Sequence, residues 1–429
     1  MINLDHDSLS FTFPEIAHQL SSHIELRICD FLPRLLEPAQ RADLLRDLES
    51  YWGFQRLPAA EQEVLRARAK SLGADEVRDA LRKATSGEHV RPRLTIGFER
   101  TLRIPDDGKA YPLPAGLGRF PLRSVDDFSG TVPASYTSRG GVLMPMYQSE
   151  ALWINFSTNY PFAVKVAAGK INAVSGEPWA SGLQRDPQNY LVVPEQPWLD
   201  GFSVGEGFIR QFVAMPLGAG YSVEEQLTGN ADFGGIQLQV YPMCAESYYR
   251  DEVAPSIPSS LCELLPWLFE HLDKQDPNRH GTSLRRAFPS LVLCEKESMG
   301  LAAGGRMRQE IYQDDHEFGD WDQTQTRRCF VHLCNSLVWR QVTGANPPHP
   351  PVTSREYKNA GVPWLDYYRD DLKPLKGSER LAGVKSVAQL GKEKNGQPLP
   401  ENSSISPNLI VQYGNTRRPA EIREFSDGQ

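Results

Sequence analysis

The sequence has little of what marks a nucleic-acid-binding or membrane-spanning protein. Its 429 residues hold 46 Lys and Arg against 54 Asp and Glu, a formal net charge of −8. Without an excess of positive charge, the composition gives no reason to expect nucleic acid as a partner. The longest charge-free apolar stretch, residues 151–164, has roughly 14 residues, whereas a membrane-spanning helix needs about 20. We therefore expect no membrane span.

Secretion signals and paired cysteines are equally scarce. The first seven residues carry neither a basic region nor an apolar run, so no secretory signal is visible. Such a small number of cysteines in a long chain predicts reduced, mostly buried thiols rather than a disulfide framework. The six are scattered: Cys29, Cys244, Cys262, Cys294, Cys329 and Cys334. We expect a soluble cytoplasmic protein.

Chain-breaking residues, by contrast, are plentiful. The chain has 34 Gly and 33 Pro, without the period that collagen requires. So many breakers favour short strands and turns over long helices. Hydrophobic residues at 40% and charged residues at 23% are typical of folded globular proteins. The length suggests two or three domains.

Residues 1–90 have the pattern of a helical N-terminal domain. Residues 14–20 predict a short amphipathic helix, and Pro38 suits the first turn of a second. A third helix is predicted over 58–72, ending at Gly73, which suits a left-handed C-cap. Val77 and Leu81, four residues apart, mark one face of a fourth helix.

Residues 91–245 have the pattern of an antiparallel β-rich domain. The apolar residues between 94 and 104 stand at even positions, which is the period of a half-buried strand: Leu94, Ile96, Phe98, Leu102 and Ile104. More short strands follow, separated by Gly and Pro turns. Gln237 and Gln239 alternate with apolar residues in one of them, which predicts one wet face. This arrangement favours an antiparallel sandwich or a barrel.

Residues 246–429 predict a mixed α+β region that packs on the β-rich domain. We expect a helix over 259–273, a strand over 329–334, and a helix capped by Asn335 that ends at Gly344. Thr353 and Glu356 form a capping box for a short helix that ends at Gly361. Residues 391–407 predict an exposed loop. The fold class we predict is α+β, a helical N-terminal region followed by a β-rich unit with short peripheral helices.

Catalytic and metal-binding motifs are incomplete. Residues 201–205 match G-x-S-x-G, but Pro194 and Pro197 interrupt the strand that a nucleophile elbow needs, so we expect a Gly-rich turn. Hard-metal ligand types gather at Asp314, Asp315 and His316, without the spacing of an EF-hand. A solvated acidic loop is the main expectation there, and a looser Mg²⁺ or Ca²⁺ site stays open.

Zinc and nucleotide motifs are also incomplete. Cys329, His332 and Cys334 cannot converge on zinc from a strand, because Cys329 points to the other face. Neither a P-loop nor a strand-linked G-x-G-x-x-G occurs. The run 304–308 (Gly-Gly-Arg-Met-Arg) offers two readings, an anion site made of amides and arginines, or a turn followed by a strand with outward arginines.

Five sequence blocks resemble a family of uncharacterised bacterial and fungal proteins. They are residues 144–148, 197–201, 209–218, 304–312 and 361–368, and together they span roughly residues 94–390. The resemblance implies one β-rich unit and transfers no catalytic residue, because the family has no established activity. Some relatives carry the label "integral membrane protein", which is at odds with the absence of a spanning segment here.

Two functional hypotheses follow. The first is a soluble binding or scaffold protein with a protein partner or a second copy of itself, and the residues we single out for binding are Arg210, Arg306, Arg308, Trp364 and Asp366. The second is an enzyme that acts on a polar or anionic substrate by acid/base or metal-assisted chemistry. Its catalytic candidates are Asp200, Glu224 and His316, with Arg306, Arg308 and Asp314 as further members of the site. No cofactor is predicted, and a divalent metal at Asp314, Asp315 and His316 is the one alternative.

Overall fold

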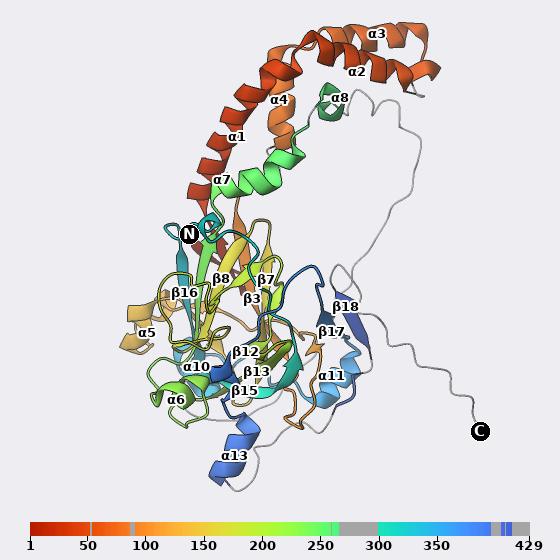
Figure 1. The fold of residues 1–429 in the computed structure, drawn as a ribbon. Coiled ribbons are helices and arrows are strands. Elements are labelled where there is room, and N and C mark those ends of the chain that lie inside the picture. The colour runs from red at the N-terminus through yellow and green to blue at the C-terminus, as the bar shows by residue number, and fades with distance from the viewer. Residues whose placement is uncertain are drawn as a thin grey trace, which may run out of the picture. The chain divides into compact units, whose positions relative to one another are not determined.

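The structure is a computed structural model, and it describes residues 1–51, 54–85, 91–258, 260–265, 299–395, 405–407 and 409–413. The chain divides into two compact units (Figure 1). One is built from Met1–Thr12, Arg93–Pro242 and Pro289–Gln429, and the other from Phe13–Pro92 and Met243–Phe288. Helices dominate the second unit and sheets the first, so the predicted α+β class is confirmed.

The unit boundaries differ from the predicted divisions 1–90, 91–245 and 246–429 in two places. Met243–Phe288 belong to the helical unit, not to the region predicted to pack on the β-rich domain, and Met1–Thr12 belong to the β-rich unit. Residues 1–12 form a hairpin of two strands, β1 (Ile2–Asp5) and β2 (Ser8–Thr12). The hairpin joins the β-rich unit because Leu9 and Phe11 stand opposite Ile96 and Leu94 of the next strand. Both are buried, and a strand brings such alternating apolar side chains onto one sheet face.

The helical unit has a long first helix in place of the short one expected over 14–20. In that helix a buried residue recurs about every four positions, namely Ile16, Leu20, Ile24, Ile28, Leu32 and Leu35, so the apolar stripe lasts for six turns. An ion pair of 2.7 Å between Arg82 Nε and Glu25 Oε1 links the first and last of the four N-terminal helices. The helices are α1 (Pro14–Leu35), α2 (Pro38–Ser50), α3 (Ala59–Lys70), α4 (Ala74–Thr85), α7 (Ala245–Tyr248) and α8 (Leu261–Leu264). Of the helix predicted over 259–273, the residues after 265 lie outside the described part.

The first large sheet contains the strand predicted from alternate apolar residues. Its even-numbered side chains from Leu94 to Phe98, and Leu102 and Ile104 beyond it, are buried. Strand order is β1-β2-β3-β7-β13-β12, with β11 paired to β7 and β15 paired to β13. The bounds are β3 (Arg93–Thr101), β7 (Ala151–Thr158), β11 (Trp198–Leu199), β12 (Gly201–Gly205), β13 (Phe208–Pro216) and β15 (Met299–Arg308).

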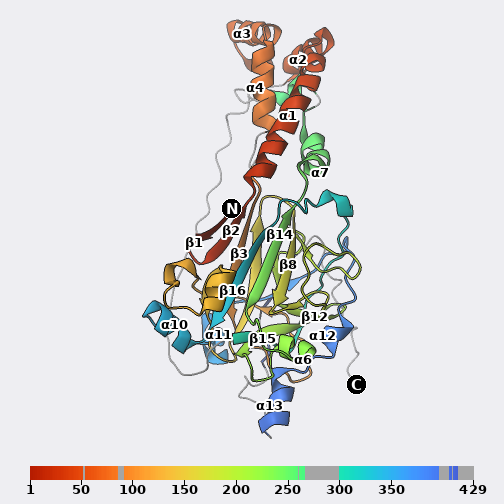
Figure 2. The same ribbon diagram turned by 90° about the vertical axis from the view of Figure 1, so that its left-hand side faces the viewer.

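The second large sheet lies against the first. Figure 2 shows β8, β14 and β16 side by side in front of β3, and in Figure 1, turned by 90°, the same strands lie beside β3 and β7. Strand order is β10-β8-β14-β16-β6-β5, with β9 paired to β8. The bounds are β5 (Arg123–Ser124), β6 (Val142–Pro145), β8 (Phe162–Ala168), β9 (Ile171–Asn172), β10 (Leu191–Val193), β14 (Ile236–Pro242) and β16 (Arg327–Cys334).

The wet face predicted for β14 is wrong. Gln237 and Gln239 are only 1% and 6% exposed, because β14 is a central strand that is covered on both faces. The Gln237 side chain uses its polar groups inside the protein, donating from Nε2 to the carbonyl of Gly169 at 2.6 Å and accepting from Arg328. A buried amide is tolerated there because it is hydrogen-bonded.

Short peripheral elements complete the β-rich unit. A third sheet has the order β18-β17-β4, with β4 (Leu113–Pro114), β17 (Trp364–Tyr367) and β18 (Ile410–Tyr413). The helices are α5 (Ala134–Arg139), α6 (Val223–Thr228), α10 (Ser336–Thr343), α11 (Ser354–Ala360), α12 (Glu379–Ala382) and α13 (Val387–Asn395).

The caps predicted at Asn335 and Thr353 are confirmed, whereas the left-handed C-cap predicted at Gly73 is wrong, because α3 ends at Lys70 with Ser71 as its C-cap and Gly73 has no positive φ. Asn335 accepts a hydrogen bond from the Val338 amide, and Thr353 forms the capping box with Glu356. One predicted loop is wrong in part. The predicted loop over 391–407 is helical as far as residue 395, because Leu390 is buried in an apolar cluster that anchors α13. No described helix is both long and apolar enough to cross a membrane.

Candidate functional site

The predicted binding arginines lie at one end of the β13–β15 pair, where Arg210 stands opposite Arg306. Arg210 Nη1 lies 3.2 Å from Asp106 Oδ1 and donates to the carbonyl of Gly304 at 3.1 Å. The Arg306 guanidinium stacks 3.7 Å from the ring centroid of Phe208. Internal contacts therefore engage both side chains.

The other members of the predicted binding set belong to the contact between β15 and β17. Arg308 Nη2 lies 3.5 Å from Asp366 Oδ2 in a half-buried ion pair. The Trp364 indole packs against Tyr111 and Tyr357. The ion pair joins two sheets, and the ring contacts bury the indole, so both sets of contacts have a structural role.

Of the two readings of residues 304–308, the structure bears out the strand and neither the turn nor the anion site. Gly304 and Gly305 lie inside β15, not in a turn, so this run forms no cradle of backbone amides. Gly305 is required by a close approach, since an added Cβ would lie 2.5 Å from the carbonyl oxygen of Pro105. The serine of the G-x-S-x-G match, Ser203, likewise lies inside a strand, β12, rather than in the expected Gly-rich turn.

Asp200, the first catalytic candidate, is a buried carboxyl between β11 and β12. Its side chain is 1% exposed, and neither carboxylate oxygen has a hydrogen-bond partner of good geometry among the described residues. Burial raises the pKa of Asp200 well above its usual value, and the neighbouring Trp198 indole opposes that shift only in part. Burial therefore favours the neutral form of this carboxyl.

Glu224, the second candidate, holds backbone in place. It stands in the first turn of α6, and its Oε2 accepts from the amide of Gly234 at 2.8 Å. Burial raises the pKa of Glu224, while hydrogen bonds from the backbone at Gly234, Lys170 and Phe233 lower it in part. Gly169 leaves room for this carboxylate, because an added Cβ there would lie 2.1 Å from Oε2.

His316, the third candidate, pairs with Asp314. The imidazole Nδ1 lies 3.1 Å from Asp314 Oδ1, and Asp314 Oδ2 accepts from the Tyr190 hydroxyl at 2.6 Å and from the Trp321 indole at 2.7 Å. These hydrogen bonds lower the pKa of Asp314 in spite of its burial. The carboxylate of Asp314 in turn raises the pKa of His316, against the effect of burial.

The structure keeps the three catalytic candidates in separate local networks. Asp200 lies between two strands of the first sheet, Glu224 binds backbone amides at α6, and His316 pairs with Asp314. Among the described residues, no group of three or more His, Cys, Asp or Glu side chains is arranged to hold a metal ion. The carboxylate oxygens of Asp314 instead make hydrogen bonds with Tyr190, Trp321 and His316.

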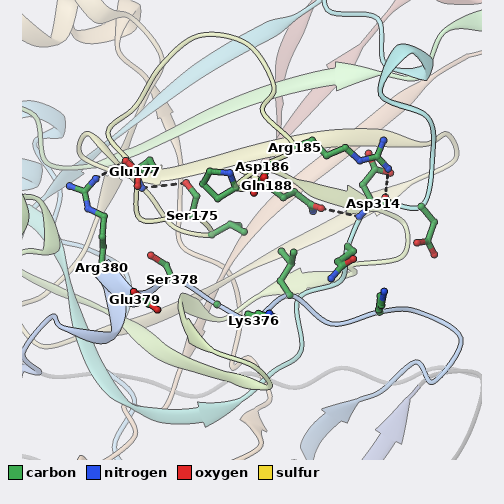
Figure 3. Close-up of a pocket in the computed structure, with 17 residues that line it drawn as sticks. Ser175, Glu177, Arg185, Asp186, Gln188, Asp314, Lys376, Ser378, Glu379 and Arg380 are labelled. Atoms are coloured by element: carbon green, nitrogen blue, oxygen red, sulfur yellow. Dashed lines mark hydrogen bonds and ion pairs between the residues drawn. The ribbon is translucent and has the colours of Figure 1, made fainter.

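Asp314 also forms part of a large polar cavity in the β-rich unit, which we call the polar groove. It has a volume of 790 Å³, within the range of small-molecule binding sites. Three separate stretches of chain supply its walls, residues 174–188, 313–315 and 373–380. Figure 3 shows Arg380 and Glu177 at one end of the groove, Arg185 and Asp314 at the other, and Lys376 along the side between them.

Internal pairing uses only part of the charge in the polar groove. Arg380 pairs with Glu177 at 2.6 Å. Arg185 is fixed in place by donating from Nη2 to the carbonyls of Asp314 and His316, at 2.6 and 2.7 Å. Two further cations, Lys373 and Lys376, are exposed on the groove wall. Acidic side chains of Asp186, Asp315 and Glu379 share that wall, so the groove displays both signs of charge.

A second cavity of 630 Å³, which we call the acidic pocket, adjoins the groove. The two share Asp315 and Lys373 as lining residues. Carboxylates outnumber cations here, and Arg369 donates from Nε and Nη2 to the carboxylate of Asp371, at 2.8 and 2.6 Å. The carboxylates are Glu206, Glu310, Asp315, Asp370 and Asp371, and the cations are Arg369 and Lys373.

The sequence prediction missed most of this groove. Of its charged lining residues, the sequence analysis singled out only Asp314 and Asp315, as weak metal-ligand candidates in an acidic loop, with Asp314 also a member of the candidate enzyme site. Arg185, Lys373, Lys376 and Arg380 carry no motif, and they meet only because three distant stretches fold together. The local signal was weak: Lys373, Lys376 and Arg380 lie close together in the sequence but not next to one another.

Comparisons of the chain with protein-family models, with curated proteins and with solved structures find no match. The resemblance described from the five sequence blocks therefore stays a prediction. Function has to be argued from the geometry of the groove itself.

Proposed function

We propose that this chain is a binding protein, and that the polar groove takes a polar ligand that carries an anionic group. The observation that carries the proposal is the placement of Arg185, Lys373 and Lys376 around a 790 Å³ cavity. Arg185 is held by two backbone carbonyls, so it meets a ligand with little loss of side-chain freedom. A protein partner, self-assembly and a cytoplasmic location belong to the same proposal.

An anionic group suits this wall for two reasons. The carboxylate of Asp314 is satisfied by Tyr190, Trp321 and His316, so it does not compete with a ligand for Arg185. Arg presents a planar set of donors that matches carboxylate and phosphate groups, and lysines add charge without fixed geometry. The acidic side chains on the same wall exclude ligands that are purely anionic and large.

The test is binding of a defined anionic probe, an acetylated and amidated Asp-Asp peptide, measured by calorimetry at low salt. We expect the double variant Lys373→Gln and Lys376→Gln to bind this peptide roughly tenfold more weakly, a loss of about 1.4 kcal/mol. Both lysines are exposed, so the substitutions leave the core untouched. Lys358→Gln, an exposed lysine of α11 outside the groove, is the matched control.

The proposal fails if the wild-type chain does not bind the peptide, or if the groove variant binds as tightly as Lys358→Gln. Raised salt must weaken the interaction, because the attraction acts between exposed charges.

An acid/base enzyme is the second candidate function, and the pairing of His316 with Asp314 favours it. A carboxylate that holds Nδ1 orients the imidazole and raises its pKa, as a general acid or base requires. Mass spectrometry of the peptide after incubation with the protein checks this candidate. A covalent change in the peptide that His316→Gln abolishes would support this candidate. An unchanged peptide would rule it out for this substrate and leave ligand binding as the proposed function.

A further inference from the structure

The polar groove and the acidic pocket adjoin, because Asp315 and Lys373 line both of them. Each cavity by itself has the size of a site for a small molecule. A ligand that used both would have to be long.

The two cavities differ in charge. In the polar groove, three basic side chains lie outside the Arg380–Glu177 pair, those of Arg185, Lys373 and Lys376. Three exposed carboxylates share the same wall, those of Asp186, Asp315 and Glu379. In the acidic pocket, the Arg369–Asp371 pair cancels itself, and Lys373 alone faces the remaining carboxylates. Those carboxylates include Glu206 and Asp370, both exposed. A ligand that spans the two cavities therefore meets both signs of charge along the groove and an excess of carboxylates along the pocket.

We infer that the natural ligand is an extended polypeptide segment of mixed charge, with acidic residues in the polar groove and basic residues in the acidic pocket. This inference rests on the proposed function of the groove. It adds the class of partner, the use of the second cavity and the order of charge along the bound segment.

A polypeptide fits these cavities better than the other polymers that carry anionic groups. A nucleic acid strand repeats its phosphates along its whole length, and the carboxylates of the acidic pocket would repel them. A peptide can place Asp or Glu at one end and Lys or Arg at the other. Neighbouring side chains of an extended chain lie about 3.3 Å apart along the strand, so a few residues separate the two charged ends.

The experiment compares three peptides on the full chain by calorimetry. They are the acetylated and amidated Asp-Asp peptide, a Lys-Lys peptide with the same ends, and a linked peptide that joins both through a Gly-Ser spacer of about 2, 4 or 8 residues. We expect the linked peptide, at its best spacer length, to bind at least about tenfold more tightly than Asp-Asp alone, because its second half binds at high effective concentration.

Charge reversal in the acidic pocket separates the two halves. The double variant Glu206→Lys and Asp370→Lys should abolish the gain of the linked peptide and leave the affinity for Asp-Asp unchanged or higher. The neutral pair Glu206→Gln and Asp370→Asn gives the same answer if the reversed protein folds poorly. Asp127→Lys, an exposed residue outside both cavities, is the matched control.

The outcomes keep this inference apart from the proposed function. Binding of Asp-Asp with no gain on linking would overturn the inference and preserve the function of the groove. A gain that survives the reversal at Glu206 and Asp370 would also overturn it, as would tighter binding of single-stranded DNA than of the linked peptide. Failure of every peptide to bind would remove the proposed function itself.

Discussion

At the scale of single residues, the β-rich unit places two carboxyl groups in opposite electrostatic environments. Asp314 accepts hydrogen bonds from Tyr190, Trp321 and His316, so burial does not prevent its ionisation. Asp200 has no comparable set of donors, and burial raises its pKa although the Trp198 indole opposes the shift in part. Both positions are aspartates, so the residue type does not distinguish them. Hence the sequence could indicate that acidic residues matter at these positions but not which of them would be charged.

The environment of Asp200 leads to a prediction about stability. The pKa of Asp200 is raised in the folded protein, whereas in the unfolded chain it is about 4. At pH values between these two pKa values, Asp200 is protonated in the folded chain and ionised in the unfolded chain. Stability must therefore fall as pH rises through that window. We expect Asp200→Asn to remove this dependence and to raise the free energy of unfolding at neutral pH by about 1–3 kcal/mol.

Urea unfolding at about pH 5 and pH 7.5 measures this effect, with Asp127→Asn, an exposed aspartate, as the control. A variant at Asp200 that is less stable than the wild type at both pH values would mean that the carboxylate is ionised and partnered in the folded protein.

At the scale of elements, periodicity and capping chemistry were sufficient to predict a helix or a strand wherever residues close in sequence determine it. The alternation from Leu94 to Phe98 gave the strand, and Asn335 and Thr353 gave the helix starts, because each signal depends on residues close in sequence. Prediction failed for Gln237 and for Gly305. Whether a polar face is wet, or a glycine turns the chain, depends on which distant strand packs against it.

The close packing around Gly305 in β15 leads to a prediction about stability. An added Cβ would lie 2.5 Å from the carbonyl oxygen of Pro105 and 2.6 Å from that of Ile104, and backbone carbonyls cannot move aside cheaply. We expect Gly305→Ala to lower the free energy of unfolding by about 1–3 kcal/mol, in the range of other overpacked sites. Chemical denaturation measures the change.

Gly205→Ala is the control, because an added Cβ at Gly205, the last residue of β12, meets no heavy atom within 4 Å. Equal stability of the two variants would show that the chain around Pro105 shifts to make room.

At the scale of the whole molecule, the groove and the cysteines show what a linear pattern leaves open. The polar groove is built from residues 174–188, 313–315 and 373–380, and no local motif could join stretches so far apart in sequence. The α+β class and the helical region near the N-terminus needed only composition and periodicity, and both were predictable. Burial of individual cysteines follows the fold, and Cys29 is exposed although most thiols were expected to be buried.

Thiol reactivity tests the fold as a whole. Cys329 and Cys334 are buried in the β-rich unit, and burial raises the pKa of each thiol to about 12. The thiolate is the reactive form, so these two must stay inert near neutral pH, while exposed Cys29 in α1 must react before either of them. We expect labelling with a thiol reagent, followed by peptide mass spectrometry, to find Cys29 modified within minutes and Cys329 and Cys334 modified only after unfolding. Labelling of Cys329 in the native protein as fast as Cys29 would mean that β16 is not a buried strand, and the arrangement of the second sheet would then be wrong.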